Sequence, residues 1–553
     1  MKSVFRLLSL LIFVTSHAYG QHVFWVTFTS KDSSFSINNP QQFLSDKAIA
    51  RRQKFSIPVV ENDLPLNVEF INTLQQKKYT IISKSKWQNG VAVKTEHKAD
   101  GDTLKQLSFV KHVQYLGAHK PIRTSRQQQV NINEMITALD AKFEPKGQQK
   151  TDSTIYGKAW NQVSMLNTQR LHKQGFDGSN VLIAVLDAGF NNVDKLPVFS
   201  KMVNENRIVT THDFVQNESS VFEDDDHGMA VLSCMAGNLK GEFIGTAPQA
   251  SYALLRSEYG VTEMPIEEVF WAEAIEYADS MGADIVNSSL GYNEFDDSYF
   301  NYSYKDLNGK ETIISAAASL AVSKGMVVVV SAGNEGDEDW RFICVPADVE
   351  EVITVGGVTR EGYYAGFSSI GPTADKRIKP DVMAQGDNVW VASSRGVFYE
   401  GDGTSYSCPL LTGSIACLMQ AHPDKNPAEI TSALHLSGNQ YYKPDKYKGY
   451  GIPDMELANL ILGNSSYQYT TLLDARLLGD KRIHLTIYVS HATRVSIEVR
   501  NELNEIVLME VVGFKAKSLN RTALKKIKKL KKGIYSLQLT TRDQTIFDKI
   551  IVH

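Results

Sequence analysis

The strongest candidate for a reactive nucleophile is Ser405, which follows Gly401 and Gly403 and precedes Pro409. Glycines supply a tight turn, and proline is tolerated in the first turn of a helix. The residues from 409 to 421 predict a helix, so Ser405 is expected at or just before its N-terminus, where the helix dipole favours negative charge. A serine in such a position is more often only a helix cap, and this segment alone does not decide its role.

Two other residues have the chemistry to activate a serine. Asp187 ends the apolar run 181–186, and a carboxylate at the carboxyl end of a buried strand can orient a histidine. His227 begins a segment of small and apolar residues and is expected at a helix start. There, one ring nitrogen can accept the serine proton while the other donates to the aspartate. Taken singly, Asp187 fits a loop cap equally well. A lone histidine such as His227 is more often a helix cap or a core residue.

A fourth candidate, Asn334, follows the apolar run 326–330 within the segment Ser-Ala-Gly-Asn-Glu-Gly. Its amide could be one donor to an oxyanion, with the Ser405 N–H as the other. Losing such a donor typically costs about 3 kcal/mol of transition-state stabilisation. The alternative is an ordinary turn asparagine.

Along the chain these segments read Asp-x-Gly, His-Gly, Ala-Gly-Asn and Gly-Thr-Ser-x-x-x-Pro, and this ordered set resembles the subtilisin-like serine peptidases. The resemblance covers about residues 151–462. It implies that Asp187, His227 and Ser405 form a catalytic triad and that Asn334 serves the oxyanion.

The same resemblance implies a substrate-binding strand. One wall of the pocket for the P1 side chain would come from the strand that pairs with the peptide backbone, and the other from the segment before the asparagine. The residues implied are Ser289, Leu290 and Gly291 for the first wall and Ala332 and Gly333 for the second. Glu335, beside this implied pocket, suggests that a basic residue at P1, the position before the cleaved bond, would be tolerated.

The fold expected for residues 151–462 is α/β, with a parallel sheet covered by helices on both faces, because near-continuous apolar runs alternate with helical stretches. Active residues in such folds lie at the carboxyl ends of the strands. Strands are predicted at 181–186, 285–286, 326–330 and 352–355, and helices at 266–281, 313–324 and 409–421.

The regions before and after residues 151–462 differ from them in sequence pattern. Residues 1–20 are typical of a secretory signal peptide cleaved near Gln21, with an N-terminal anchor helix as the alternative. Residues 21–118 alternate strand and helix patterns, with a strand at 23–29 and helices at 66–76 and 103–110 among them. They predict a small α+β module. Its segments 43–52 and 85–91 resemble the inhibitory propeptides of this family; the alternative is a retained binding domain.

A polar stretch over 119–150 predicts a linker and a proteolytic site. Residues 465–553 predict a compact all-β, sandwich-like domain with strands at 483–489, 494–500, 505–511, 533–539 and 545–551. Its segments 495–501, 532–537 and 549–552 resemble the sorting domains of type IX secretion, and this resemblance implies the secretion machinery as a partner. The basic run 525–532 fits either an anionic surface or, more simply, a solvated sheet edge.

Length and composition limit the classes of protein to which this chain could belong. The length of 553 residues predicts about three structured units. A hydrophobic share of 42%, a charged share of 22% and a net charge of −4 fit a soluble globular protein and argue against a dedicated nucleic-acid binder. No transmembrane helix is predicted in the mature protein.

The four cysteines form no CxxC pair, and there is no HExxH or zinc-finger spacing, so neither a metal site nor a cofactor is predicted. The acidic run 223–226 lacks a spaced calcium loop. Cys408 and Cys417, nine positions apart on one expected helix, would lie roughly 13 Å apart, beyond disulfide reach. All four, which include Cys234 and Cys344, are expected to be small buried hydrophobes.

We therefore expect a serine endopeptidase, secreted or at the cell surface, made as a self-processing zymogen that acts on proteins or peptides. The alternative is a non-catalytic surface protein that uses the same scaffold for binding. The sequence leaves open whether such a peptidase is broad or narrow in specificity.

Overall fold

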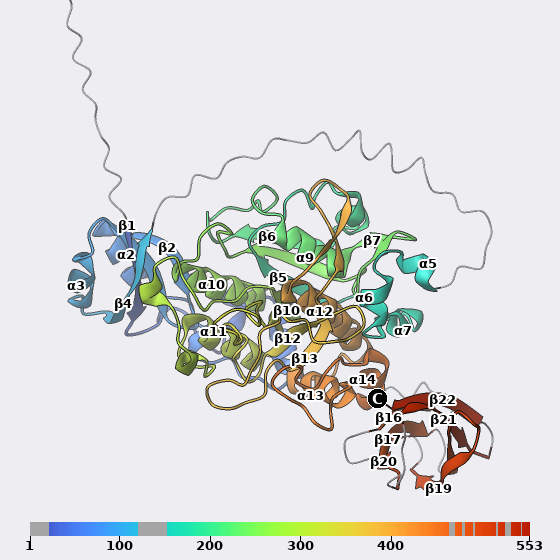
Figure 1. The fold of residues 1–553 in the computed structure, drawn as a ribbon. Coiled ribbons are helices and arrows are strands. Elements are labelled where there is room, and N and C mark those ends of the chain that lie inside the picture. The colour runs from blue at the N-terminus through green and yellow to red at the C-terminus, as the bar shows by residue number, and fades with distance from the viewer. Residues whose placement is uncertain are drawn as a thin grey trace, which may run out of the picture.

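The computed structural model describes residues 21–119, 152–463, 471–477, 482–489, 493–515, 518–525, 532–542 and 545–552. The predicted signal peptide and nearly all of the predicted linker lie outside the described residues. We call residues 21–119 the N-terminal module, 152–463 the central domain, and the described residues from 471 onward the C-terminal module (Figure 1).

A seven-stranded, fully parallel sheet forms the centre of the molecule, in the order β13-β12-β11-β10-β5-β9-β6. Most of its strands are buried from end to end, which explains their continuous Val and Ile runs. Their bounds are β5 Leu182–Asp187, β6 Ile208–Asp213, β9 Ser251–Arg256, β10 Ile285–Ser288, β11 Val327–Ser331, β12 Ile353–Val358 and β13 Val382–Gln385.

Helices cover both faces of this sheet. On one face α9 (His227–Ala236) and α12 (Thr404–Ala421) close a large core, and on the other α10 (Ile266–Met281) and α11 (Ile313–Ser323) close a second. The predicted α/β architecture is therefore confirmed. The other elements of this domain are α5 Asp152–Tyr156, α6 Trp160–Ser164, α7 Thr168–Lys173, α8 Ser200–Asn204, α13 Pro427–Ser437, α14 Met455–Ile461, β7 Asn238–Leu239, β8 Phe243–Ile244, β14 Val389–Ala392 and β15 Phe398–Gly401, with 3-10 helices at Pro197–Phe199, Ser298–Phe300 and Tyr304–Asp306.

The N-terminal module is an antiparallel sheet in the order β2-β3-β1-β4 with three helices. Its elements are β1 Gln21–Phe28, α1 Asp46–Lys54, α2 Val68–Gln76, β2 Thr80–Ser85, β3 Gly90–Thr95, α3 Asp100–Lys105 and β4 Val110–His119, with 3-10 helices at Pro40–Gln42 and Glu61–Asp63. The helix predicted over 103–110 is wrong in its bounds. Acidic residues favour the earlier start of α3, whereas Phe109 and Val110 suit the entry into β4.

This module packs on helices α10 and α11 of the central domain. Trp25 and Trp87 belong to the same apolar cluster as the buried side chains of those helices. Beside them, the Glu276 carboxylate accepts hydrogen bonds from the Ser85 hydroxyl and from the N–H groups of Lys86 (2.7 Å) and Trp87 (3.1 Å). Apolar burial and the hydrogen-bonded Glu276 carboxylate together fix the N-terminal module on the central domain.

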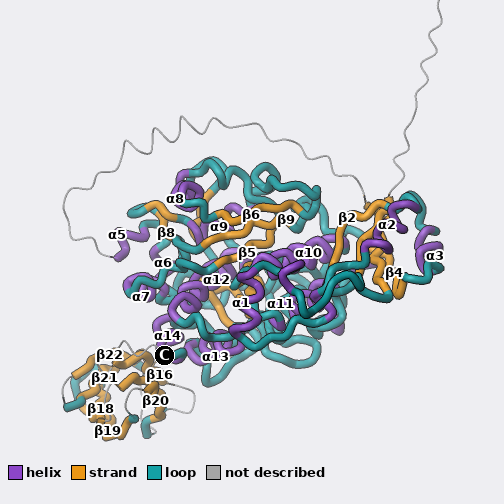
Figure 2. The backbone as a smooth tube through the Cα atoms, turned by 180° about the vertical axis from the view of Figure 1, so that it is seen from behind, coloured by secondary structure: helices purple, strands orange, loops and turns teal. Residues whose placement is uncertain are grey.

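A second contact lies at α1, which leaves the module's own sheet and lies along the central domain (Figure 2). Arg52, only 1% exposed, donates to Asp63 Oδ2 at 3.0 Å and to Asp279 Oδ2 at 2.7 Å. Arg51 donates to Asp279 and to the carbonyls of Ala283 and Lys324. These carbonyls follow the ends of α10 and α11, where a cation is favoured.

The C-terminal module is a sandwich of two antiparallel sheets, β16-β17-β20 and β19-β18-β21-β22, around one apolar cluster. The strands are β16 Thr471–Leu477, β17 Ile483–Val489, β18 Thr493–Arg500, β19 Ile506–Phe514, β20 Ser518–Ala523, β21 Gly533–Thr540 and β22 Thr545–Val552. All five predicted strands are present. The sequence pattern missed β16 and β20, which flank β17 and carry charged residues that hide the apolar alternation.

Candidate active site

Asp187 and His227 are hydrogen-bonded to each other. Asp187 is the last residue of β5 and is fully buried, and its Oδ1 lies 2.7 Å from Nδ1 of His227, the first residue of α9. The approach is close because residue 228 is glycine: a Cβ there would collide with the Gly189 carbonyl and crowd Asp187. Asp187 Oδ1 also accepts the Ala188 N–H at 2.8 Å, which orients the carboxylate.

The charges around His227 favour its protonated form. Burial lowers its pKa, but the charge of Asp187 and the hydrogen bond to it, with Glu258 and Asp225 adding, outweigh burial and raise the pKa of His227 to about 9. Since Nδ1 faces Asp187, Nε2 is the nitrogen left to exchange a proton with another group.

The acidic run 223–226 lies beside this pair and has internal partners. Asp225 Oδ1 accepts the His227 N–H at 2.7 Å, so the run sets the position of the histidine backbone. Asp224 forms an ion pair with the buried Arg256 at 3.1 Å. Within the described ranges, no group of three or more His, Cys, Asp or Glu side chains is placed to hold a metal ion.

Ser405 is the second residue of α12, directly after a turn that only glycine adopts easily: Gly403 has φ +149°. The Ser405 hydroxyl donates to the carbonyl of Ser289 at 3.3 Å, and the Ser289 hydroxyl donates back to the Ser405 carbonyl at 2.9 Å. The serine therefore lies inside the first turn of its helix and faces the end of β10.

The helix begins earlier than the sequence indicates. We expected Pro409 in the first turn, but α12 starts at Thr404 and Pro409 lies inside the helix. A proline there removes the N–H that would bond the carbonyl four residues before it, which is that of Ser405. The Ser289 hydroxyl occupies that carbonyl instead, which is why the helix tolerates the proline.

Asn334 lies three residues beyond the end of β11 and is tied to the start of α12. Its Oδ1 accepts the N–H of Thr404 at 2.8 Å and the Thr404 hydroxyl at 3.0 Å. With the oxygen occupied on that side, the Nδ2 group is the end of the amide that remains for a ligand.

One open cavity of about 260 Å³ brings most of the predicted residues together. His227, Ser405 and Asn334 line it. So do Ser289, Leu290, Gly291 and Gly333. Ala332 does not: it is fully buried, bonding through its N–H to Val355 and through its carbonyl to Cys344. Asp187 stays behind His227 in the protein interior.

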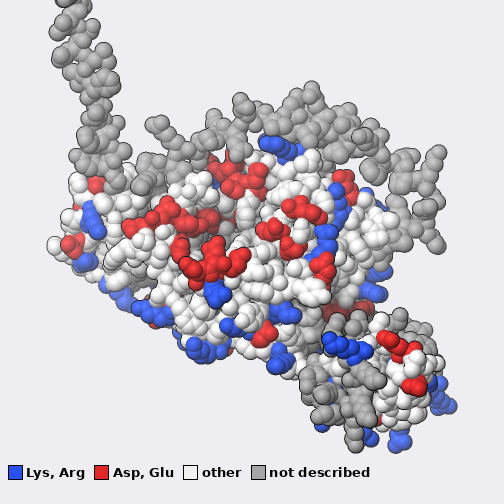
Figure 3. Space-filling view, viewed as in Figure 1, with Lys and Arg blue, Asp and Glu red and all other residues white. Residues whose placement is uncertain are grey.

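Three glutamates also line this cavity, of which sequence reasoning picked out only Glu335. Glu258 and Glu263 follow β9, so the rule that functional residues cluster at strand carboxyl ends could have found them. Burial first, then Glu263 and Asp187, raise the pKa of Glu258 to about 8. Burial, with Asp296 and Glu335, raises the pKa of Glu263 to about 7. Acidic side chains also gather over the middle of the domain in Figure 3.

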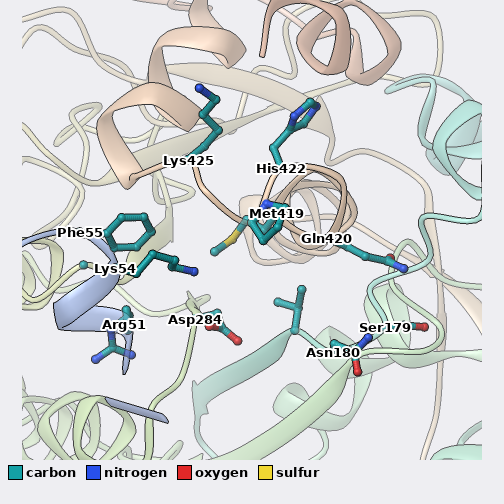
Figure 4. A pocket seen from close by; sticks show the side chains of 13 residues that line it. Arg51, Lys54, Phe55, Ser179, Asn180, Asp284, Met419, Gln420, His422 and Lys425 are labelled. Atoms are coloured by element: carbon teal, nitrogen blue, oxygen red, sulfur yellow. The ribbon is translucent and has the colours of Figure 1, made fainter. Parts of the chain in front are cut away.

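A second cavity of about 260 Å³ lies between α1 and the central domain (Figure 4). Arg51 and Lys54 from α1 face it, together with Asp284 and with Met419 from the end of α12. It contains none of the predicted site residues. This second cavity lies where α1 of the N-terminal module crosses the central domain, near the residues that precede β5 and β10.

All four cysteines are buried, as predicted, and the structure shows that they are also unpaired. Cys344 differs from the other three in that it lines the cavity, and its thiol donates to Glu335 Oε2 at 3.1 Å. None of the described helices combines the length and apolar character needed to cross a bilayer.

A parallel sheet with a serine, a histidine–aspartate pair and an amide gathered at one edge is the arrangement of a serine peptidase. Comparison with known proteins agrees. Residues 178–451 match the profile of the Subtilase family, and residues 23–133 match the Peptidase S8 propeptide domain of Bacteroidota. The chain belongs to the subtilase family of serine peptidases and carries a propeptide domain of that family.

The relatives named here are about one-quarter identical to this chain over the aligned residues. Subtilisin NAT of Bacillus subtilis subsp. natto is 27% identical over 300 residues, which cover 54% of this chain and 70% of that protein. Serine protease AprX of Bacillus subtilis (strain 168) is 28% identical over 321 residues, covering 52% and 68% respectively. The crystal structure of MycP1 with the N-terminal propeptide removed is 24% identical, with a TM-score of 0.43 over 54% of this chain and 96% of that one.

Proposed function

We propose that this protein is a secreted serine endopeptidase in which Ser405 attacks the peptide carbonyl, His227 transfers the proton and Asp187 orients the imidazole. Asn334 Nδ2 and the Ser405 N–H receive the oxyanion. The observation that carries the proposal is the 2.7 Å bond between His227 and Asp187 in the wall of the cavity that Ser405 lines. Bonds to a reacting serine are often long in unliganded sites and tighten when substrate binds.

Each group has the environment that its role needs. Asp187 is fully buried, which strengthens its attraction to an imidazolium. Ser405 is near the positive end of α12 and its N–H is directed toward the start of that helix. Asn334 is held through its oxygen, so its donor is oriented before the reaction starts.

The test is labelling of the processed protein with a fluorophosphonate, which reacts with an activated serine. We expect stoichiometric labelling of the wild type and none in Ser405→Ala. Ser407→Ala is the matched control, because Ser407 is buried in the same helix turn and donates to the Thr404 carbonyl. Absence of labelling in the wild type would favour the binding-protein alternative, and equal labelling of Ser405→Ala and wild type would assign the reactive serine to another position.

We further infer that the N-terminal module acts as an inhibitory propeptide, which the protein itself releases by a cut within residues 119–150. The extensive buried contact with α10 and with Asp279 supports a tight inhibitory association. Purified wild-type chain should convert to two fragments cut within that segment, whereas Ser405→Ala should stay intact. Cleavage of both at the same rate would assign the cut to another peptidase.

Secretion and sorting complete the proposal: residues 1–20 direct export, and residues 465–553 form the C-terminal sorting domain for type IX secretion machinery. The sandwich fold of the C-terminal module is compatible with such a role. Removing residues 465–553 should leave the protein inside the outer membrane of its host, and fractionation of the culture measures this.

A further inference from the structure

The cavity that Ser405 lines has a carboxylate set between its two walls. A Cβ on Gly333 would collide with Glu335 Oε2, so this carboxylate lies directly against the wall that Gly333 forms. A Cβ on Gly291, in the opposite wall, would come within 2.9 Å of Cys344 Cβ. Cys344 and Glu335 are joined by the 3.1 Å thiol–carboxylate contact. Glu335 and Cys344 therefore close the space between the walls.

This carboxylate is held in place and still has an open face. The Ser369 hydroxyl donates to Glu335 Oε2 at 2.6 Å and accepts the Glu335 N–H at 3.0 Å. Among the described residues, the thiol of Cys344 and the hydroxyl of Ser369 both bond to Oε2. Oε1 is thus available to a group that enters the cavity.

Two more carboxylates extend the same negative surface. Glu263 Oε2 is buried without a hydrogen-bond partner within the described part of the chain, and Glu258 receives one long bond from the Tyr292 hydroxyl at 3.4 Å. None of the described residues that line the cavity is a lysine or an arginine. Burial and nearby acidic side chains raise the pKa values of Glu258 and Glu263, so a cation that enters the cavity would favour their ionised forms.

Uncompensated buried carboxylates destabilise a folded protein unless a cation pairs with them. A lysine or arginine side chain can supply that cation, because it threads an apolar stem between glycine walls and presents its charge at the far end. A neutral P1 residue would bring no cation to the three carboxyl groups.

We propose that this cavity selects peptides with lysine or arginine at P1, with Glu335 as the residue that pairs with the cation and Glu263 and Glu258 as supporting charges. The inference rests on the proposed peptidase function and adds its substrate class. It requires no group beyond those of the chain and the substrate.

The experiment uses the self-processed wild-type protein and peptides that differ only at P1. Arginine is compared with citrulline, and lysine with norleucine, because each pair matches in size and differs in charge. We expect kcat/KM to favour the charged member by about 10- to 100-fold. The preference should shrink as salt is raised, since it is electrostatic.

Glu335→Gln should reduce the arginine-to-citrulline ratio by about 10-fold or more. Glu263→Gln, as a second variant, should produce a smaller reduction. Glu338→Gln is the matched control: Glu338 is an exposed glutamate three residues along the chain and does not line the cavity. Melting temperatures show that each variant is folded.

Equal cleavage of the charged and neutral peptides by the wild type would overturn this inference and leave the peptidase proposal intact. The same holds if Glu335→Gln and Glu263→Gln, both folded, keep the full ratio. Failure to cleave any peptide, including one with leucine at P1, or cleavage that persists in Ser405→Ala, would instead overturn the peptidase proposal.

Discussion

Ser289 and Ser405 hold each other through two hydrogen bonds that run in opposite directions. The Ser289 hydroxyl donates to the Ser405 carbonyl at 2.9 Å, and the Ser405 hydroxyl donates to the Ser289 carbonyl at 3.3 Å. The first bond replaces the one that Pro409 cannot make. The end of β10 and the start of α12 are thereby joined at the proposed reaction centre.

This relationship predicts that Ser289→Ala leaves the Ser405 carbonyl unpaired. We expect the free energy of unfolding to fall by about 1–3 kcal/mol, the cost of an unsatisfied buried acceptor. Unfolding is measured with denaturant in a Ser405→Ala background, which prevents self-digestion.

The second arm of this test restores the missing donor. Pro409→Ala supplies an N–H four residues after Ser405, so Ser289→Ala should cost less in its presence. A double-mutant cycle measures the coupling. If the two substitutions prove strictly additive, the proposed exchange of donors between Ser289 and Pro409 is wrong.

Asn334 should matter for rate and little for stability. In Asn334→Asp the side chain still accepts from Thr404 but has no N–H to offer, so kcat should fall by about 10²- to 10³-fold with little change in melting temperature. Thr404 itself tests the tether: Thr404→Val removes one of the two bonds to Asn334 and should lower kcat less. An Asn334→Asp variant with wild-type kcat would remove this residue from the oxyanion site.

The pH profile should report the charge of His227. Because the neutral imidazole is the form that accepts the serine proton, kcat/KM should rise with pH as His227 deprotonates, with an apparent pKa of about 9. Glu258 contributes to that raised pKa. Glu258→Gln should therefore shift the rising limb toward lower pH, and Glu338→Gln should leave it in place. A shift to higher pH in Glu258→Gln would contradict the assignment.

The contact at α1 should dominate the stability of the precursor. Arg52→Ala leaves Asp63 and Asp279 without their shared guanidinium in a buried site, so the unfolding free energy of the Ser405→Ala chain should fall by about 3–5 kcal/mol. The exposed Arg170→Ala should change it by less than about 0.5 kcal/mol. Limited proteolysis of residues 40–63 should accelerate only in the first variant. Equal losses in both variants would mean that α1 is not a specific clamp.

Much of the reacting chemistry could be predicted from local sequence. Asp187 comes at the end of an apolar run that predicts a buried strand. His227 and Ser405 both lie at the start of a segment that predicts a helix. Because parallel strands end at one edge of a sheet, residues at strand ends were bound to lie near one another. The covered parallel sheet, the module before it and the β-rich module after it followed from the same periodicities.

The contacts between distant segments could not be read in this way. No spacing rule places Arg52 against Asp279, Ser289 against the carbonyl of Ser405, or Cys344 against Glu335. Their positions depend on how α1 crosses the central domain and on how the loops after β10 and β11 turn.

The sequence by itself determined which residues can react and on which element each stands, because periodicity and turn residues act over a few positions. Only the tertiary structure decided which side chains meet. Contacts such as those of Cys344 with Glu335 and of Ser289 with Ser405 form because the sheet and its helices pack closely against each other. That packing depends on the whole chain. It brought three glutamates into one cavity, fixed the orientation of Asn334, and placed the Ser289 hydroxyl where Pro409 has no N–H to donate.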